Sequence, residues 1–466
     1  MKNTLRNRTR LLQDPVGSTL MRLALPMIFG ILSMVVYNLA DTFFVGRLGH
    51  EQLAALSFTF PVVLAIGSLA QGIGMGASAV VSRAIGSENY RRVRRLATDS
   101  LILGILVVGI GAAIGLLTIR PLFSLLGAEG VVLDYIDEYM SVWYFGMIFV
   151  VIPMVGNNII RATGDSKTPG MVMILGAIAN FILDPLLIFG LGPFPELGIR
   201  GAALATLFGR GLTFLIAMYV LAVREKLLAY TIPKPAEVWA SWREILHIGI
   251  PNAATKMIIP LGNGFVTRVV ASYGAAAVAG YGVATRLEFF SLAALNALSS
   301  VVGPFVGQNL GAKKLDRVKA GFTTSGRFSL YVGGFLFLVY LILAGEIARI
   351  FNTDPEVVAT SSLYLRIVSF GYAAQGFYLV VSAGLNVMKR PLQAAGLSAL
   401  EMFGFSVPLA LLGSHLFGTA GVFAAIAFSY TATGLFALWT VRRVLTKFMP
   451  SLLKDIEAEI PTTTGP

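Results

Sequence analysis

Residues 101–119 read LILGILVVGIGAAIGLLTI and contain no charged side chain. An α-helix rises about 1.5 Å per residue, so a run of this length covers roughly 28 Å, which matches the hydrocarbon core of a bilayer. The run therefore predicts a membrane-spanning helix. Working outward from it, twelve runs of about 22 to 32 mostly apolar residues can be marked, and they begin near residues 19, 53, 97, 134, 170, 198, 244, 277, 321, 356, 392 and 418.

The composition favours a membrane protein over a water-soluble one. Hydrophobic residues make up 56% of the 466 residues and charged residues 13%, whereas soluble proteins carry about 25% charged residues. The chain has no cysteine and three histidines, which excludes disulfides and thiolate metal sites and leaves little for a histidine cage. We therefore expect no cofactor.

The positions of Lys and Arg predict the orientation of the chain. The two tails and every second connection between spans together contain 25 of them, whereas the alternate connections contain four, Arg47, Arg120, Arg200 and Arg349. Because positive residues concentrate on the cytoplasmic side, both termini are expected in the cytoplasm. The first segment lacks the apolar core and cleavage site of a signal peptide. Topology thus explains the net charge of +12, and nucleic acid is not an expected partner.

The two halves of the sequence match each other under a shift of 225 residues. Leu25-Pro26 falls on Ile250-Pro251, Gly49 on Gly274 and Gly86 on Gly311. A duplicated unit of six spans keeps the same orientation in both copies, as in secondary transporters that rock two bundles about a cavity, although duplication also occurs in membrane proteins that transport nothing. The expected parts are a cytoplasmic tail at 1–18, a first lobe at 19–223, a cytoplasmic linker at 224–243, a second lobe at 244–446 and a cytoplasmic tail at 447–466.

Polar groups inside the spans of the first half are candidates for a cation site, because such groups are costly in a bilayer. Asp41 lies in the first span and Asp184 in the fifth, with Asn180 on the same helix face as Asp184 and Thr206 at a similar depth in the sixth. Their oxygen atoms suit Na+, and two neighbouring carboxylates suit a proton equally well. Asp41 could instead be an interfacial residue that pairs with Arg47.

Other intramembrane positions predict a moving helix, a cavity and a structural network. Pro26 is either a simple kink or the point where the first helix bends when Asp41 changes its charge. The candidates for the lining of a cavity that accepts bulky apolar cations are Tyr37, Asn38, Asn157 and Met173. In the second half, opposite charges at similar depth predict a network of ion pairs among Lys256, Arg286, Glu288 and Glu401.

The sequence contains no motif of an enzyme or of a nucleotide-driven pump. It has no phosphate-binding loop that ends in Gly-Lys-Ser/Thr, no His-Glu-x-x-His zinc motif and no Gly-x-Ser-x-Gly nucleophile elbow. The glycines of Gly72-Ile73-Gly74-Met75-Gly76 lie inside an apolar span, where they favour close helix packing rather than nucleotide binding. The chain is therefore not expected to be an enzyme.

Several motifs give the chain, over nearly its whole length, a resemblance to the multidrug and toxic compound extrusion (MATE) family. They are Asp41-Thr42-Phe43-Phe44-Val45-Gly46 with Leu53-Ala54-Ala55-Leu56, Arg161-Ala162-Thr163-Gly164-Asp165 with Lys167-Thr168-Pro169, Asn180-Phe181-Ile182-Leu183-Asp184-Pro185, and Gly198-Ile199-Arg200-Gly201-Ala202-Ala203. The resemblance implies an all-α integral membrane fold of twelve transmembrane helices in two pseudo-symmetric six-helix bundles. It also implies exchange of H+ or Na+ for amphiphilic, often cationic drugs.

Within that family, the resemblance is to the DinF-like branch, which places its coupling carboxylate on the first helix, where this chain has Asp41. The same resemblance assigns Asn180, Asp184 and Thr206 to the cation site. The NorM-like branch uses acidic residues of the seventh and tenth helices, but this chain has Lys256 in the seventh and no acidic residue from 357 to 388 in the tenth. That difference argues against cation binding in the second lobe.

The sequence thus predicts a multidrug exporter of a bacterial or archaeal cytoplasmic membrane, coupled to H+ or Na+ and working by alternating access as a monomer. The main alternative is a flippase for lipids or lipid-linked saccharides, whose cavity should carry many Arg and Lys to hold phosphates. A membrane enzyme and a channel are further alternatives that the residue pattern disfavours.

Overall fold

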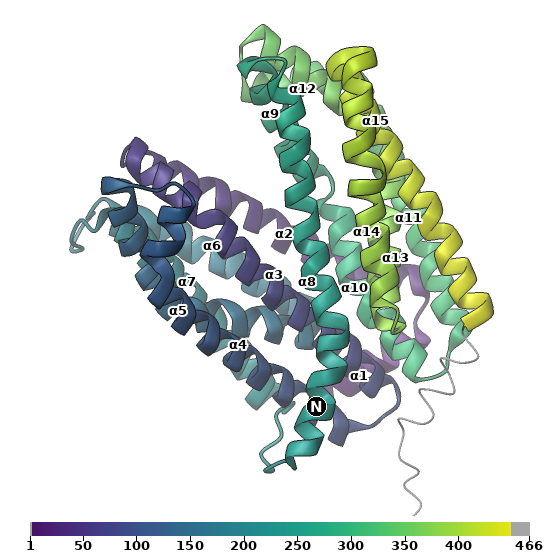
Figure 1. The fold of residues 1–466 in the computed structure, drawn as a ribbon. Coiled ribbons are helices and arrows are strands. Elements are labelled where there is room, and N and C mark those ends of the chain that lie inside the picture. The colour runs from purple at the N-terminus through teal and green to yellow at the C-terminus, as the bar shows by residue number, and fades with distance from the viewer. Residues whose placement is uncertain (1, 449–466) are drawn as a thin grey trace, which may run out of the picture. The chain divides into compact units, whose positions relative to one another are not determined.

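The computed structural model describes residues 2–448, and every regular element in this part of the chain is helical (Figure 1). The first half contains α1 (Lys2–Gln13), α2 (Val16–Gly46), α3 (His50–Gly86), α4 (Tyr90–Leu125), α5 (Gly130–Ala162), α6 (Lys167–Ile188), α7 (Gly198–Tyr219) and η1 (Val220–Arg224). The second half contains α8 (Pro235–Ala271), α9 (Ala275–Ser291), α10 (Ala293–Gly311), α11 (Leu315–Phe351), α12 (Pro355–Val368), η2 (Ser369–Gly371), α13 (Tyr372–Val387), α14 (Pro391–Ala399), η3 (Leu400–Ser406), α15 (Val407–Arg443) and η4 (Val444–Phe448).

The predicted spans all fall on helices. Nine helical segments of residues 2–448 are long and apolar enough to cross a membrane, and the bent pair of α9 and α10 provides a tenth. One of the nine, Pro391–Lys447, covers two predicted spans, because its backbone leaves the helical conformation at Phe417 and Gly418. The span predicted from residue 244 lies in α8, which is 37 residues long. The all-α membrane fold predicted from the sequence is therefore present.

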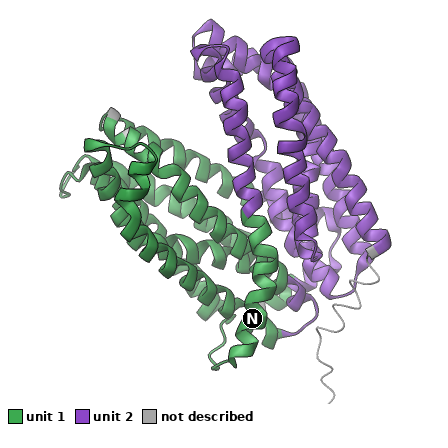
Figure 2. Cartoon of the chain, viewed as in Figure 1, with its two compact units in different colours: residues 1–7, 26–81, 90–253 green, residues 8–25, 82–89, 254–466 purple. Residues whose placement is uncertain are grey.

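The chain forms two compact units (Figure 2). Unit 1 comprises residues up to 7, 26–81 and 90–253, and unit 2 comprises 8–25, 82–89 and residues from 254 onward. The predicted lobes differ from these units at helix ends, since 8–25 and 82–89 belong to unit 2. The predicted linker at 224–243 is helical from Pro235, where α8 begins. Of the predicted C-terminal tail, residues 449–466 lie outside the described residues.

Close backbone contacts explain why segment 82–89 belongs to unit 2. A Cβ atom on Gly86 would lie 2.2 Å from the carbonyl oxygen of Gln308, and one on Gly311 would lie 2.2 Å from that of Arg83. Only glycine permits such an approach. Gly86 and Gly311 are the residues that match under the shift of 225, so each repeat supplies one glycine to a reciprocal contact.

The segment predicted as a cytoplasmic N-terminal tail forms a helix, and the second half of this helix packs in unit 2. Leu11 and Leu12 of α1 are buried. In unit 2, the guanidinium of Arg317 donates to the carbonyl oxygens of Leu11 and Asp14, at 2.9 and 2.7 Å. These bonds satisfy carbonyl groups at the C-terminal end of α1, where partners within the helix run out, and the Leu11 oxygen also accepts from the Asn309 side chain at 3.2 Å.

In unit 1, helix α7 packs against both α5 and α6. Small residues bring α6 and α7 together, because a Cβ atom on Gly201 would lie 2.2 Å from the carbonyl oxygen of Leu187 and one on Gly176 would lie 2.8 Å from Cγ2 of Thr213. Without side chains at these points, the two helices approach closely along much of their length. Polar residues on their facing sides consequently come within hydrogen-bonding distance.

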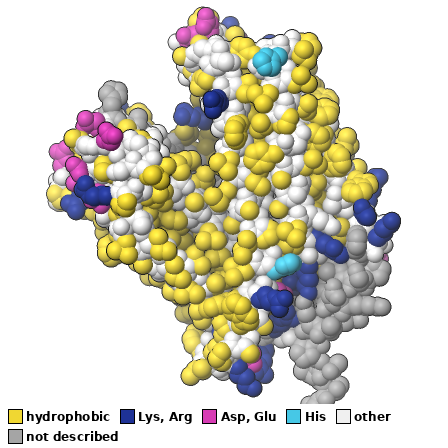
Figure 3. Space-filling view, viewed as in Figure 1, with side chains coloured by type: hydrophobic (Ala, Val, Ile, Leu, Met, Phe, Trp, Pro, Cys, Tyr) yellow, Lys and Arg dark blue, Asp and Glu magenta, His cyan; other side chains and the backbone are white. Residues whose placement is uncertain are grey.

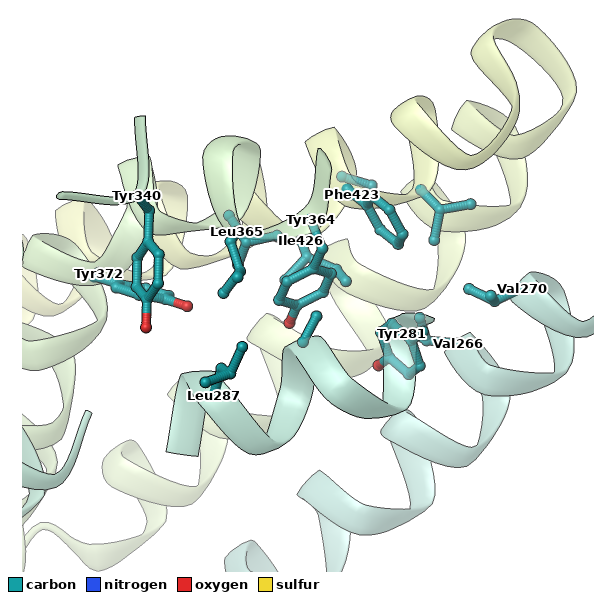
Figure 4. Close-up of a cluster of buried hydrophobic side chains, with 14 of the residues drawn as sticks. Val266, Val270, Tyr281, Leu287, Tyr340, Tyr364, Leu365, Tyr372, Phe423 and Ile426 are labelled. Atoms are coloured by element: carbon teal, nitrogen blue, oxygen red, sulfur yellow. The ribbon is translucent and has the colours of Figure 1, made fainter. Parts of the chain in front are cut away.

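Unit 2 is built around an aromatic core (Figure 4). The ring of Tyr364 on α12 lies edge-on to Phe423 on α15 and to Tyr281 on α9, with centroids 5.0 and 5.6 Å apart. Leu287 and Ile426 belong to the same buried cluster. Edge-to-face pairs of this kind add to the stabilisation from burial alone. The core thus ties α9, α12 and α15 together.

Large apolar side chains cover the outer faces of the helices (Figure 3). Leu117 on α4 is 82% exposed, Leu215 on α7 65% and Ile342 on α11 73%. Water-soluble monomers rarely expose apolar surface on this scale, so these faces are suited to contact with lipid. Together with the helix lengths, they identify a multi-pass membrane protein.

Candidate functional site

Three helices of unit 1 bring four of the predicted site residues together. Asn180 and Asp184 lie one turn apart on α6, Thr206 lies on α7 and Tyr37 on α2. With its nitrogen toward Asp184, the Asn180 amide donates to Oδ2 of Asp184 at 2.8 Å and accepts from the backbone N–H of Thr206 at 3.2 Å. The Thr206 hydroxyl lies 3.5 Å from that amide and 3.4 Å from the Tyr37 hydroxyl. We call these four residues the polar cluster.

The polar cluster is closed off from solvent. Asp184 is 0% exposed and Asn180 2%, and Tyr37 and Thr206 are also buried. A carboxylate in such a place needs hydrogen bonds or a bound cation, because an isolated buried charge is strongly disfavoured. The carboxylate, the amide and the hydroxyls offer oxygen ligands that fit either a proton or Na+. Residues 2–448 contain no group of three or more His, Cys, Asp and Glu side chains that could hold a metal ion.

Asp41 lies near the polar cluster without a hydrogen bond to it. Its side chain is half-buried on α2, one helical turn after Tyr37. The Asp41 carboxylate interacts electrostatically with Asp184 and with Arg210. The predicted four-residue cation site thus separates into a hydrogen-bonded group on α6 and α7 and a second carboxylate within its electric field.

A cavity of about 150 Å³ opens beside the polar cluster within unit 1. Five of the residues predicted from the sequence line it: Tyr37, Asn157 and Met173 from the predicted cavity, and Asn180 and Thr206 from the predicted cation site. Asn38 does not, since it is exposed and is not among the lining residues. Asn38 points about 100° away from Tyr37 around the axis of α2, and in this direction its side chain is exposed.

Two arginines line the same cavity, and sequence reasoning missed both as site residues. Arg161 lies near the end of α5 and donates to the Asn158 side chain, while the guanidinium of Arg210 on α7 lies 5.6 Å from the centre of the Tyr37 ring. The signal for Arg210 was present in the sequence. It follows Thr206 by four residues inside a span, which places both on one helix face.

Pro26 lies within the continuous helix α2, at a tight contact with α6. A Cβ atom on Gly170 would lie 2.5 Å from the carbonyl oxygen of Pro26. The division between unit 2 and unit 1 falls between Leu25 and Pro26, which is the position predicted for the bend. A proline at this point removes one backbone hydrogen bond from the helix.

The ion-pair network predicted for the second half is wrong. Glu288 is buried and accepts hydrogen bonds from Tyr364 at 2.6 Å and Tyr430 at 2.9 Å, whereas Lys256 and Arg286 are exposed. Glu401 accepts from Gln375 at 3.1 Å. Among the described residues, no ion pair joins any two of the four charged groups. Residues two apart on a helix point to nearly opposite sides, so Arg286 faces away from Glu288.

Comparisons with known proteins agree with this architecture. A family model described as MatE matches residues 26–186 and again residues 251–412. The chain belongs to the MatE family. The two matches begin 225 residues apart (251 less 26), the same shift that aligns the halves of the sequence. The chain is therefore a membrane transporter and not an enzyme.

Individual relatives of this MatE chain carry different substrate names. It is 38% identical over 440 residues to a protein named "FAD transporter" from Shewanella oneidensis, covering 94% of this chain and 97% of the relative. It is 26% identical over 455 residues to the "Multidrug export protein MepA" of Staphylococcus haemolyticus, covering 95% and 97%. A crystal structure of the Vibrio cholerae MATE transporter VcmN in its bent form matches with a TM-score of 0.87 and 28% identity over 98% of this chain and 99% of that one.

Proposed function

We propose that this MatE transporter is a secondary active exporter that exchanges H+ or Na+ for amphiphilic organic molecules by alternating access. The observation that carries the proposal is the buried hydrogen-bonded cluster of Asn180, Asp184 and Thr206, of which Asn180 and Thr206 also line the cavity. A change in the charge of Asp184 therefore reaches the cavity through one amide. Ion binding and substrate binding share residues in this arrangement.

The proposed cycle uses the electrostatic link between Asp184 and Asp41. A cation taken up from outside neutralises one of the two carboxylates, Asp41, which removes their mutual repulsion. Helix α2 then bends at Pro26, where Gly170 of α6 holds it in close contact, and the bend reshapes the cavity and releases the substrate. Only a difference in the ion's affinity for the two conformations can bias the cycle, and a tenfold gradient supplies about 1.4 kcal/mol.

Two substrate classes enter the proposal. The relatives named as multidrug proteins support amphiphilic drugs, as the sequence also suggested. The Shewanella relative supports a flavin dinucleotide, and its identity of 38% to this chain favours this class. A flippase for lipids or lipid-linked saccharides is the remaining alternative. We place the protein in a bacterial or archaeal cytoplasmic membrane as a monomer with both termini in the cytoplasm, on the distribution of Lys and Arg.

Transport by purified protein in liposomes tests this function. Wild type is compared with Asp41→Asn, Asp184→Asn and the control Asp137→Asn, which removes a partly exposed carboxylate that pairs with Arg120. Ethidium and FAD serve as substrates, each with an imposed proton gradient or an imposed Na+ gradient. Wild type and the control should transport at least one substrate against its gradient, and the two cluster variants should lose the response to the ion.

The outcomes separate the alternatives. Gradient-driven transport that persists in both cluster variants would contradict the coupling site. Translocation of fluorescent phospholipid by wild type, without movement of ethidium or FAD, would identify a flippase. Comparing the two gradients also identifies the coupling ion.

A further inference from the structure

The cavity of unit 1 is positively charged at its wall. Arg161 and Arg210 line it, and among the described residues that line it there is no carboxylate. The remaining polar groups are neutral amides and hydroxyls, such as those of Gln71 and Asn157. A cavity of this kind suits an anionic group better than the cationic drugs expected from the sequence.

Neither arginine is neutralised by direct pairing. Elsewhere in unit 1, Arg95 pairs with Asp99 and Arg224 with Asp165. Within residues 2–448, Arg161 forms its hydrogen bond to a neutral amide and Arg210 faces an aromatic ring, and no ion pair joins either to a carboxylate. A charge inside a span without such a partner, as at Arg210, is expensive, which makes it a candidate for ligand binding. Arg161 lies near the end of α5 and lines the same cavity.

We propose that Arg210 and Arg161 bind the phosphate or pyrophosphate group of the exported molecule, so that the substrate is a phosphate-bearing aromatic compound such as a flavin nucleotide. This proposal rests on the proposed function, because it names the substrate class of the same site. Guanidinium groups bind phosphate through paired hydrogen bonds, and two of them neutralise a dianion.

The volume of the cavity is large enough for only part of the proposed substrate. Pockets for whole drug-sized molecules occupy about 300–1,000 Å³, whereas this cavity measures about 150 Å³. It has room for an anionic group and part of an adjoining ring, and the rest of the molecule lies outside it. Met34, Met173 and Tyr37 supply sulfur and aromatic contacts to that ring.

An anionic substrate changes how the ion acts. Asp41 offsets the charge of Arg210 when both are charged, and neutralising Asp41 leaves this arginine to attract the anion more strongly. The ion and the substrate therefore do not compete by charge. Release of the substrate must then follow from the change in shape of α2.

The test compares three flavins that share one ring system. Binding of FAD, FMN and riboflavin to purified protein in phosphatidylcholine nanodiscs is measured by flavin fluorescence without any ion gradient. Riboflavin lacks phosphate, so wild type should bind FAD and FMN about 10- to 100-fold more tightly than riboflavin. Arg210→Gln and Arg161→Gln should each remove most of that preference, weakening the binding of FAD and FMN much more than that of riboflavin. Arg210→Lys should retain part of it.

Controls and contrary outcomes are defined by the same assay. Arg120→Gln, which alters an exposed arginine paired with Asp134 and Asp137, should leave all three affinities unchanged. Equal binding of FMN and riboflavin by wild type, or equal loss of both in the arginine variants, would overturn the proposal. Because no gradient is present, either result leaves ion coupling untouched, and a failure of coupling in Asp41→Asn leaves the binding result valid.

The phosphate group that the two arginines bind could also come from a lipid headgroup. Nanodiscs with and without phosphatidylglycerol distinguish it. If this lipid raises the thermal stability of wild type but not of Arg210→Gln, and FMN does not bind, then the arginines hold a headgroup and the soluble substrate is overturned. If FMN binds equally well with and without the lipid, the proposal stands.

Discussion

Replacement of Gly170 by alanine tests whether the contact between α2 and α6 at Pro26 governs transport. The Cβ atom of alanine would lie 2.5 Å from the carbonyl oxygen of Pro26 and 2.9 Å from its carbonyl carbon. Ordinary contacts begin near 3.4 Å, so the two backbones must separate by about 1 Å. Forcing extra volume into a packed contact costs about 1–3 kcal/mol, and alanine recovers part of this by its higher helix propensity.

The expected net loss is therefore about 1–2 kcal/mol, which lowers the melting temperature of a unit of this size by roughly 2–8 °C. Thermal unfolding in detergent, followed by tryptophan fluorescence, measures the loss, and transport in liposomes measures its functional effect. Gly67→Ala is the matched control, since no atom lies within 4 Å of a Cβ atom built there. We expect Gly170→Ala to transport more slowly than this control. Equal melting temperatures and equal transport in the two variants would refute the reasoning.

Three further predictions concern the cluster, the second unit and the lipid-facing surface. Asn180→Leu leaves Asp184 without its amide donor and should lower the free energy of unfolding by about 1–3 kcal/mol, measured by thermal unfolding. Asn180→Gln should retain part of the hydrogen bond. Unchanged stability of the leucine variant would show that the bond does not form. Glu288→Leu leaves two buried tyrosine hydroxyls without acceptors and should lower the free energy of unfolding by about 2–4 kcal/mol. Ion-coupled transport at low temperature should be preserved. Loss of coupling with an unchanged melting temperature would assign Glu288 to the ion pathway. Leu215→Asp places a charge against lipid at a cost of about 2.5–3.5 kcal/mol and should reduce the amount of membrane-integrated protein. The control Leu215→Ala should not reduce it. Equal yields of the two variants would mean that this position does not face hydrocarbon.

Much of the fold could be predicted because each transmembrane helix meets the length and hydrophobicity requirements of the bilayer by itself. The run at 101–119 has the length and composition of a transmembrane helix whatever the rest of the chain does. The duplication is likewise visible in single residues, and the matching Gly49 and Gly274 both adopt positive φ, 145° and 102°, just before α3 and α9. The break at Gly418 was also anticipated, as the start of the last span.

The candidate site was predicted where its residues lie on one helix. Asn180 and Asp184 are four residues apart, so helical geometry alone places them side by side. Thr206 was added to the site because its estimated depth in the membrane is similar to that of Asp184, and similar depth brings residues of neighbouring helices together. Asn38 was assigned to the cavity on composition, without regard to its direction, and the structure turns it away.

Length, hydrophobicity and the placement of charges thus determined the membrane class and the number of spans, because the transfer of a segment into lipid is a sum over its own residues. Residue matches at one shift determined the duplicated design. Only the tertiary structure decided which faces of the helices pack against one another. Only the contact of α2 with α7 puts Arg210 beside Tyr37 in one cavity. Only the aromatic core of unit 2 gives Glu288 its partners at Tyr364 and Tyr430, which lie 76 and 142 residues away. The rotation of each helix about its axis depends on close contacts such as those at Gly176 and Gly201, and such contacts between distant segments leave no local pattern in the sequence.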